Sequence, residues 1–132
     1  MKGDLFLPDT SAILTMMDNE EGADVVENIL RTKDILLPAI VLFEIYYTTI
    51  QNKGIEIAES RYATVKSIKA NHIAELHEPV LLKGGELKAR HKISLADSII
   101  AAYALVYKAT LVHKDPEFEA ITEVNQIKLP YK

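Results

Sequence analysis

The sequence contains no cysteine, and it carries fewer basic than acidic residues. The lack of cysteine excludes disulfide bonds and zinc sites built from thiolates. It also suits a reducing compartment, so we expect a cytoplasmic protein. The 15 basic and 19 acidic residues give a formal net charge of −4. A protein that holds nucleic acid through its overall charge is usually basic, so any such contact must be made here by a local patch.

Long apolar runs are also missing from the sequence. No stretch reaches the roughly 20 apolar residues that a membrane-spanning helix needs. Asp4, Pro8 and Asp9 interrupt the only apolar stretch near the N-terminus, which argues against a signal peptide. There is no internal repeat, and a chain of 132 residues is long enough to bury a core. We therefore expect a single domain over residues 1–132.

Short apolar runs alternate with longer amphipathic segments along the chain. Predicted strands are Asp4–Leu7, Asp34–Leu37, His72–Leu76, Thr110–His113 and a candidate fifth, Gln126–Leu129. Predicted helices are one capped by Thr10 or Ser11 that reaches Met17, then Glu20–Arg31, Pro38 to about Asn52, Glu56–Ala70, Pro79–His91, Ser94–Lys108 and a short Pro116–Ile121. This alternation predicts a three-layer α/β/α fold with a central parallel sheet of four or five strands.

One acidic residue lies alone inside an apolar run. Glu44 stands within Ala39–Tyr47, and no lysine or arginine lies within one helical turn of it. A carboxylate in such a run must stay solvated, become protonated or find a positive partner. Glu44 is in the middle of a predicted helix, so it cannot be a cap. It therefore either faces solvent or belongs to a site.

Three aspartates stand next to other apolar runs. Asp9 follows the first predicted strand, Asp115 follows the fourth, and Asp97 opens the long helix. Each can simply cap a helix: Ser94-x-x-Asp97 resembles a capping box, and Asp115-Pro116 suits a helix start. However, ligands of parallel sheets bind beyond the carboxyl ends of the strands, so Asp9 and Asp115 are expected to converge. Four acids that meet at one point would most naturally hold a hard divalent cation.

The order and spacing of these residues resemble the PIN domain family. Asp9-Thr10-Ser11 after a strand is similar to its opening motif, and Glu44 lies where the family places an acid on a helix. The segment from Ser94 to Ala104 resembles its third motif, and Leu111–Phe118 resembles its fourth. The likeness extends over residues 5–129. It is closest to compact members such as the VapC-type toxins of toxin–antitoxin pairs.

This resemblance implies a metal-dependent endoribonuclease with Asp9, Glu44, Asp97 and Asp115 around Mg²⁺ or Mn²⁺. Mg²⁺ usually binds through only one or two carboxylates. We therefore expect Asp9 and Asp97 to be direct ligands, and Glu44 and Asp115 to bind directly or through water, or to position the nucleophile. Ser11 is expected to hydrogen-bond to this group. The resemblance also implies an RNA substrate, an antitoxin partner and a homodimer.

Position 113 departs from the family pattern. The family commonly has threonine or serine two residues before the fourth acid, and this chain has His113. An imidazole there can ligate a softer metal such as Mn²⁺, or it can hydrogen-bond to a ligand. Hard cations prefer oxygen, which favours the second role.

Basic residues stand close to two of the acids. Arg90 and Lys92 precede the Asp97 helix, and Lys114 adjoins Asp115. We predict that these three contact RNA, although each can also be an ordinary solvated charge. Upstream, Gly84-Gly85 indicates either a weak helix or a loop.

Three other functions fit parts of the pattern. The first is a nuclease of the same fold that acts in RNA maturation or decay without an antitoxin. The second is a phosphatase with a nucleophilic aspartate after the first strand, but Ser11 occupies the place of its second aspartate. The third is a non-catalytic binding module that keeps the fold. The presence of all four acids argues against the third, because unneeded buried carboxylates destabilise a core.

Overall fold

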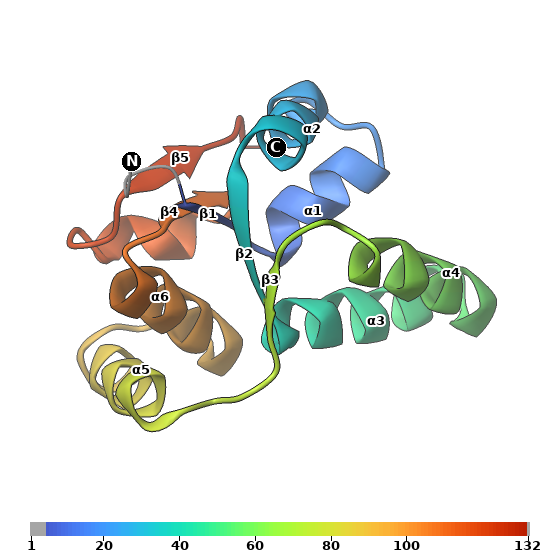
Figure 1. Ribbon diagram of the computed structural model, residues 1–132. Helices are drawn as coiled ribbons and strands as arrows, with labels where there is room; N and C mark the ends of the chain where they lie inside the picture. Colours follow the sequence, from blue (N-terminus) through green and yellow to red (C-terminus); the bar gives the residue numbers. More distant parts are fainter. Residues whose placement is uncertain (1–4, 132) are drawn as a thin grey trace.

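The computed structural model describes residues 5–131, and it confirms the predicted α/β/α arrangement around a parallel sheet (Figure 1). Five parallel strands lie in the order β3-β2-β1-β4-β5. They are β1 (Leu5–Pro8), β2 (Asp34–Pro38), β3 (Asn71–Ile73), β4 (Thr110–His113) and β5 (Gln126–Lys128). The candidate fifth strand is therefore present. The predicted start of the first strand, Asp4, lies outside the described residues.

Six α-helices and a short 3₁₀ helix connect the strands. They are α1 (Thr10–Met17), α2 (Ala23–Thr32), α3 (Ala39–Lys53), α4 (Ile55–Lys66), α5 (Glu78–Arg90), α6 (Leu95–Tyr107) and the 3₁₀ helix η2 (Pro116–Ala120).

Three predicted helix ends were wrong. Asp9, rather than Thr10 or Ser11, is the cap of α1. The second helix starts at Ala23 and not at Glu20, because Gly22 before it has a φ of 100° that helical residues do not adopt. The fourth helix ends at Lys66, since Ser67 is its C-cap and the next residues lead into β3.

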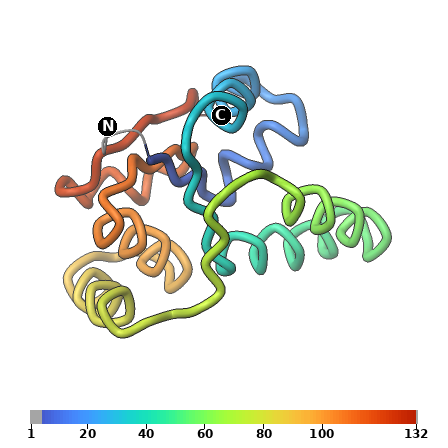
Figure 2. The backbone as a smooth tube through the Cα atoms, viewed as in Figure 1, coloured from blue at the N-terminus to red at the C-terminus, as the bar shows by residue number. Residues whose placement is uncertain are grey.

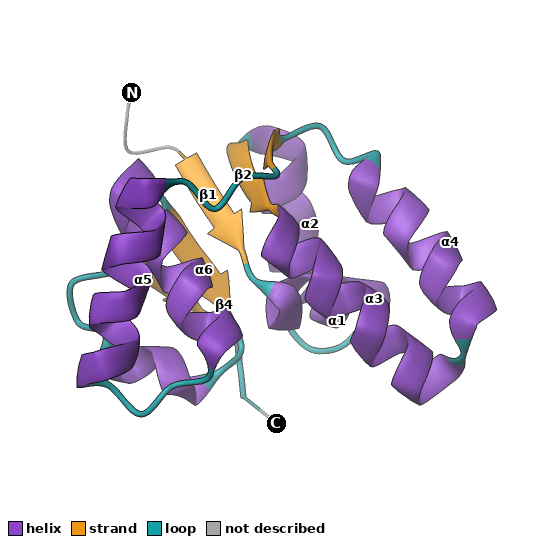
Figure 3. Ribbon diagram, turned by 90° about the horizontal axis from the view of Figure 1, so that it is seen from below, coloured by secondary structure: helices purple, strands orange, loops and turns teal. Residues whose placement is uncertain are grey.

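The helices divide into two groups around the sheet. Figures 2 and 3 show α5 and α6 on one side of the strands and α1 to α4 on the other. Right-handed crossovers explain this division: the chain moves from β1 through β2 to β3 in one direction and then returns to β4 beside β1. The direction thus reverses between β1 and β4. At such a switch point the connections leave a crevice beyond the carboxyl ends of the strands.

The core is continuous through both helical layers. Leu7, Leu37 and Leu111 of the central strands are fully buried, as expected for a parallel sheet covered on both faces. The Gly84-Gly85 pair lies inside a single helix, α5, and not in a loop. This helix packs closely on α6, because a Cβ atom at Gly84 would lie 3.6 Å from the Cβ of Ala102.

Over residues 5–131, no helix is long and apolar enough to cross a membrane.

Candidate active site

A pocket of about 320 Å³ opens at the carboxyl edge of β1 and β4. Carboxylates dominate its lining, because all four predicted acids reach it together with a fifth that was not predicted. The acids are Asp9, Glu44, Asp97, Asp115 and Glu117. They come from the end of β1, from α3, from the start of α6 and from the turn after β4 together with the adjoining helix η2.

Asp9 is both a helix cap and a member of the pocket. Its Oδ1 accepts hydrogen bonds from the Ala12 amide at 2.8 Å and from the Ser11 hydroxyl at 2.7 Å. The residue is only 2% exposed. Burial raises the pKa of Asp9 to about 7, although the bonds from Ser11 and Ala12 lower it and the charges of Asp115 and Glu44 raise it further. Since both bonds fall on Oδ1, the second carboxylate oxygen is the one available to a ligand.

Ser11 forms hydrogen bonds with residues that follow β1 and β4 at the pocket. Its hydroxyl donates to Asp9, and its oxygen accepts the backbone amide of Lys114 at 2.8 Å. The predicted contact between Ser11 and the acids is therefore present. It also fixes the turn after β4 relative to α1, so the relative positions of Asp9 and Asp115 depend on this hydroxyl.

Glu44 lies at the rim of the pocket and has a specific partner. The Thr10 hydroxyl donates to Glu44 Oε1 at 2.6 Å, and the residue is half-buried. Burial raises the pKa of Glu44, the Thr10 bond opposes that change, and the charge of Asp115 adds to it. Glu44 is therefore neither an ordinary solvent-facing residue nor one that is neutralised by a cation.

We expect Thr10→Val to raise the pKa of Glu44 further. The hydrogen bond from Thr10 stabilises the charged carboxylate, and the valine variant lacks it. The free energy of unfolding should change by only about 1 kcal/mol. Thr48→Val is the matched control, since the Thr48 hydroxyl donates to the backbone oxygen of Glu44, also at 2.6 Å. NMR titration of the Glu44 carboxyl checks this. Equal pKa values in the two variants would show that Thr10 does not control this carboxylate.

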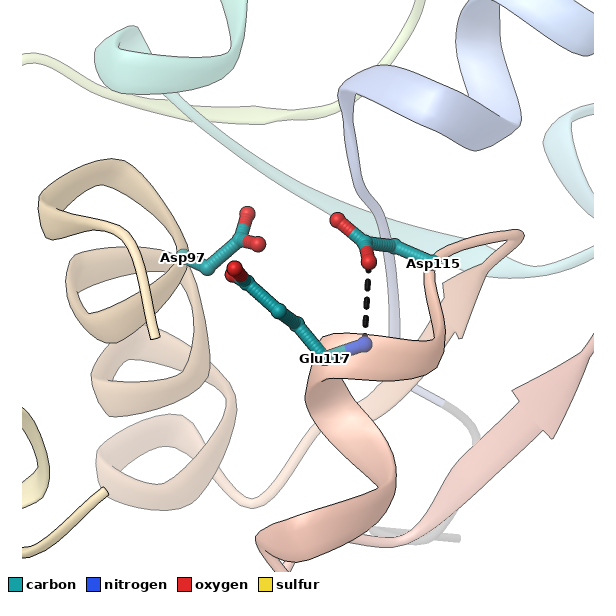
Figure 4. Close-up of side chains that lie close together, drawn as sticks. All are labelled: Asp97, Asp115 and Glu117. Atoms are coloured by element: carbon teal, nitrogen blue, oxygen red, sulfur yellow. Dashed lines mark hydrogen bonds between the residues drawn. The ribbon is translucent and has the colours of Figure 1, made fainter. Parts of the chain in front are cut away.

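Asp97 lies in the first turn of α6 but does not act as its cap. The Ser94 hydroxyl oxygen accepts the Asp97 amide at 3.1 Å. The reciprocal bond of the predicted capping box is not made by Asp97: the Ser94 amide donates to Glu117 Oε1 at 3.0 Å. The capping-box interpretation is thus right for Ser94 and wrong for Asp97. Its carboxylate is left to point into the pocket (Figure 4).

Asp97, Asp115 and Glu117 form the tightest group of acids. Each offers one carboxylate oxygen, and these oxygens lie within 4.8 Å of one another. In Figure 4 the carboxylates of Asp97 and Glu117 point toward each other. Asp115 caps η2, where its Oδ1 accepts the Glu117 amide at 2.9 Å. Such a cluster needs either a proton or a cation to offset its charge.

The pKa values of this group indicate where that proton lies. Burial raises the pKa of Asp97 to about 10, and its hydrogen bonds with Glu117 and Asp115 add to the effect. The hydrogen bond with Asp97 conversely lowers the pKa of Glu117. Without a cation, Asp97 therefore carries the proton and Glu117 carries the charge. A divalent cation bound to these all-oxygen ligands would replace that proton, and Mg²⁺ and Mn²⁺ prefer such ligands.

Both ring nitrogens of the buried His113 are occupied by protein groups. Nδ1 accepts the Asp115 amide at 3.0 Å, and Nε2 lies 2.8 Å from Gln126 Oε1. Burial lowers the pKa of His113, which favours a neutral ring. This geometry leaves neither nitrogen for a metal ion, so it supports the hydrogen-bonding role over the ligand role.

The three predicted RNA contacts differ in their surroundings. The Lys114 side chain is 7% exposed, and its Nζ donates to the Glu21 carbonyl at 2.9 Å. It holds the connection between α1 and α2, so we do not retain it as an RNA contact. Arg90 and Lys92 are exposed near the start of α6. Arg90 makes only a loose ion pair with Glu86 at 3.7 Å.

Comparisons with known proteins agree with this architecture. The PIN domain family pattern matches residues 6–124, whereas no curated protein matches the sequence. Among solved structures, VapBC2 from Rickettsia felis bound to promoter DNA has a TM-score of 0.77 at 20% identity, covering 96% of this chain and 99% of that one. VapBC-1 from nontypeable Haemophilus influenzae has a TM-score of 0.73 at 22% identity, with coverages of 94% and 97%.

A third similar structure is described by its activity. VapC20 of Mycobacterium tuberculosis, a toxin that cleaves the sarcin–ricin loop, has a TM-score of 0.71 at 15% identity, covering 88% of this chain and 94% of that one. At such identities these likenesses concern the fold. The family match over residues 6–124 decides against the phosphatase alternative. The chain belongs to the PIN domain family.

Proposed function

We propose that this protein is a metal-dependent endoribonuclease and the toxin of a toxin–antitoxin pair. The observation that carries this proposal is the pocket in which five acids from four separate parts of the chain meet at the carboxyl edge of the sheet. Membership of the PIN domain family and the likeness to VapC structures support it. A merely structural role would not explain why so many carboxylates are held together against their mutual repulsion.

The residues present fit a hard divalent cation. Asp9 and Asp97 are the proposed direct ligands, and Asp115 and Glu117 complete the group directly or through water. A bound Mg²⁺ or Mn²⁺ supplies a water of lowered pKa and an electrophile for the phosphoryl oxygen. Glu44, oriented by Thr10, is proposed to position the attacking water. Ser11 and Ser94 hold the turns that carry these acids.

Cleavage of a mixed pool of labelled RNAs tests this function. The purified protein is incubated with Mg²⁺, Mn²⁺ or EDTA, beside the Asp9→Asn variant. We expect cutting that needs metal and is lost in the variant. A folded protein that cuts no RNA with either metal would refute the nuclease and favour the non-catalytic binding module.

Arg90 and Lys92 are the proposed contacts to the RNA backbone. We expect replacement of both by glutamine to weaken RNA binding and to reduce the slope of log K against log salt by about 2. Fluorescence anisotropy in the Asp9→Asn background, which prevents cleavage, measures both quantities.

The control for this experiment is Arg31→Gln with Lys69→Gln. These exposed residues precede β2 and β3, at the opposite edge of the parallel sheet. Arg31 also has a loose ion pair at 3.7 Å, here with Glu27, so the charge change and its local cost are matched. An equal loss of affinity in both double variants would indicate nonspecific attraction and would remove the proposed patch.

We also propose an antitoxin partner and a homodimer. Structures similar to this chain are VapBC toxin–antitoxin structures, which supports a protein partner. Leu81, Leu82 and Leu95 are 52–67% exposed on α5 and the first turn of α6, and exposed apolar groups of this kind favour protein contacts. Light scattering of the purified chain tests the dimer: a monomer at micromolar concentration would contradict it.

A further inference from the structure

The hydrogen bonds around His113 determine which of its nitrogens carries the proton. Nδ1 accepts the backbone amide of Asp115, so this nitrogen presents its lone pair. The proton of the neutral ring must then be on Nε2, which donates to Gln126 Oε1 at 2.8 Å. The tautomer follows from its two neighbours.

The amide group of Gln126 is itself held in one orientation by two backbone carbonyls. Its Nε2 donates to the carbonyl of Phe118 at 2.8 Å and to that of Ile121 at 3.0 Å. Both donors are therefore used on η2 and the residue after it, which leaves the amide oxygen to face His113. A flipped amide would place its donors against the imidazole N–H and its oxygen against two carbonyls. The carbonyls of Phe118 and Ile121 thus orient the Gln126 amide so that its oxygen accepts the Nε2–H of His113.

The bond from the Asp115 amide to His113 has a familiar form. It joins a side chain to the amide two residues later, as the oxygen of aspartate, asparagine, serine or threonine does in Asx and ST turns. Here an imidazole nitrogen takes the place of that oxygen. Asp115 then accepts the Glu117 amide on its own side chain. A continuous series of hydrogen bonds thus leads from Gln126 on β5 to two acids of the pocket.

Water cannot replace these bonds. His113 is fully buried, and its ring lies 5.0 Å from that of Phe118 and 6.5 Å from that of Tyr131 between ring centres. A buried amide that loses its acceptor costs free energy until the backbone moves to find another. The direction of the Asp115 side chain is therefore sensitive to the state of the imidazole.

We propose that His113 and Gln126 are positioning residues for Asp115. Gln126 holds His113 as the Nε2–H tautomer, and the free Nδ1 then fixes the backbone from which the Asp115 carboxylate enters the pocket. The catalytic consequence rests on the proposed nuclease function, whereas the tautomer itself does not. Neither residue touches substrate or metal in this role.

The decisive experiment is Gln126→Met in two backgrounds. In the natural background we expect kcat for RNA cleavage to fall about 10-fold with KM within about 2-fold, as when an interaction specific to the transition state is lost. The second background is His113→Asn, whose side-chain oxygen accepts the Asp115 amide without any choice of tautomer. There Gln126→Met should change kcat less than about 2-fold, while the melting temperature falls similarly in both backgrounds. An equal loss of kcat in both would reduce Gln126 to a structural role and overturn the proposal.

A second measurement needs no activity and no variant. Nitrogen-15 NMR of the metal-free protein distinguishes a protonated from an unprotonated ring nitrogen, and we expect His113 to be protonated on Nε2 only. Protonation on Nδ1 would overturn the proposal even if RNA is cleaved. If the protein cleaves no RNA with metal, the nuclease function fails separately, and the NMR result still decides the question of the tautomer.

Discussion

Asp97→Asn will abolish the proposed RNA cleavage while making the metal-free protein more stable. Asp97 has a pKa of about 10 in the folded protein in place of 3.8, so near neutral pH folding must protonate a carboxylate that is ionised in the unfolded chain. Asparagine keeps the shape and the donor toward Glu117 without that cost. We expect a stabilisation on the order of 2 kcal/mol, which corresponds to a rise in melting temperature of roughly 6–10 °C.

The loss of cleavage should be at least about 100-fold, because residues that only support a metal ligand already change activity by about 10- to 100-fold and Asp97 is a proposed direct ligand. Thermal melts in EDTA and cleavage assays with Mn²⁺ measure the two effects. Asp34→Asn is the control, since Asp34 is exposed at the amino end of β2 and should change neither. A marked drop in the melting temperature of Asp97→Asn would instead assign Asp97 a structural role.

The metal-free protein should lose stability as the pH rises from about 4 to about 7, and divalent metal should offset this loss. Asp9 has a folded pKa of about 7 and an ordinary value of 3.8. Between these values the folded state holds more protons than the unfolded state, so the free energy of unfolding falls with pH. The stabilisation by protonated Asp9 is complete below pH 3.8 and lost above pH 7, and it amounts to about 4 kcal/mol. Asp97 contributes over the same range and continues the trend toward pH 10, whereas Glu117, with its lowered pKa, opposes it only below its ordinary value of 4.5.

Metal binding opposes this loss of stability because it favours the ionised acids. At a metal concentration 100 times Kd the gain is about 2.7 kcal/mol, and it should be largest above pH 7. Melting curves between pH 4.5 and 8, with EDTA or with Mn²⁺, test both parts. Asp9→Asn should make the metal-free profile less steep between pH 4.5 and 7 and leave the part of the slope that Asp97 contributes. If the free energy of unfolding of the metal-free protein instead increased toward pH 7, the raised pKa of the buried Asp9 would be contradicted.

The sequence predicted most of the fold because apolar periodicity and parallel-sheet rules are local. It also predicted that four acids would meet, since Asp9 and Asp115 each follow a strand. Glu117 was missed: its contacts with Ser94 and Asp97 depend on how η2 packs against α6. Its only signal in the sequence was its position two residues after Asp115.

Two other residues show why neighbours in sequence are a poor guide to a site. Lys114 adjoins Asp115, yet its side chain turns away to the Glu21 carbonyl and does not line the pocket. The role of His113 could not be read without Gln126, which stands 13 residues later on another strand. Both facts come from tertiary packing rather than from any local pattern.

The pairing of β1 with β4 sets the time at which activity can first exist during synthesis. β1 pairs with β2 on one side, but on the other side Phe6 is aligned with Thr110 and Leu7 with Leu111, so its second partner is made more than 100 residues later. A domain generally folds as a unit, and here Asp115 and Glu117 emerge from the ribosome more than 100 residues after Asp9. A nascent chain of the proposed toxin is therefore harmless until β4 and the two acids that follow it have been made. An antitoxin already present in the cell would then meet each molecule as it first becomes able to cut RNA.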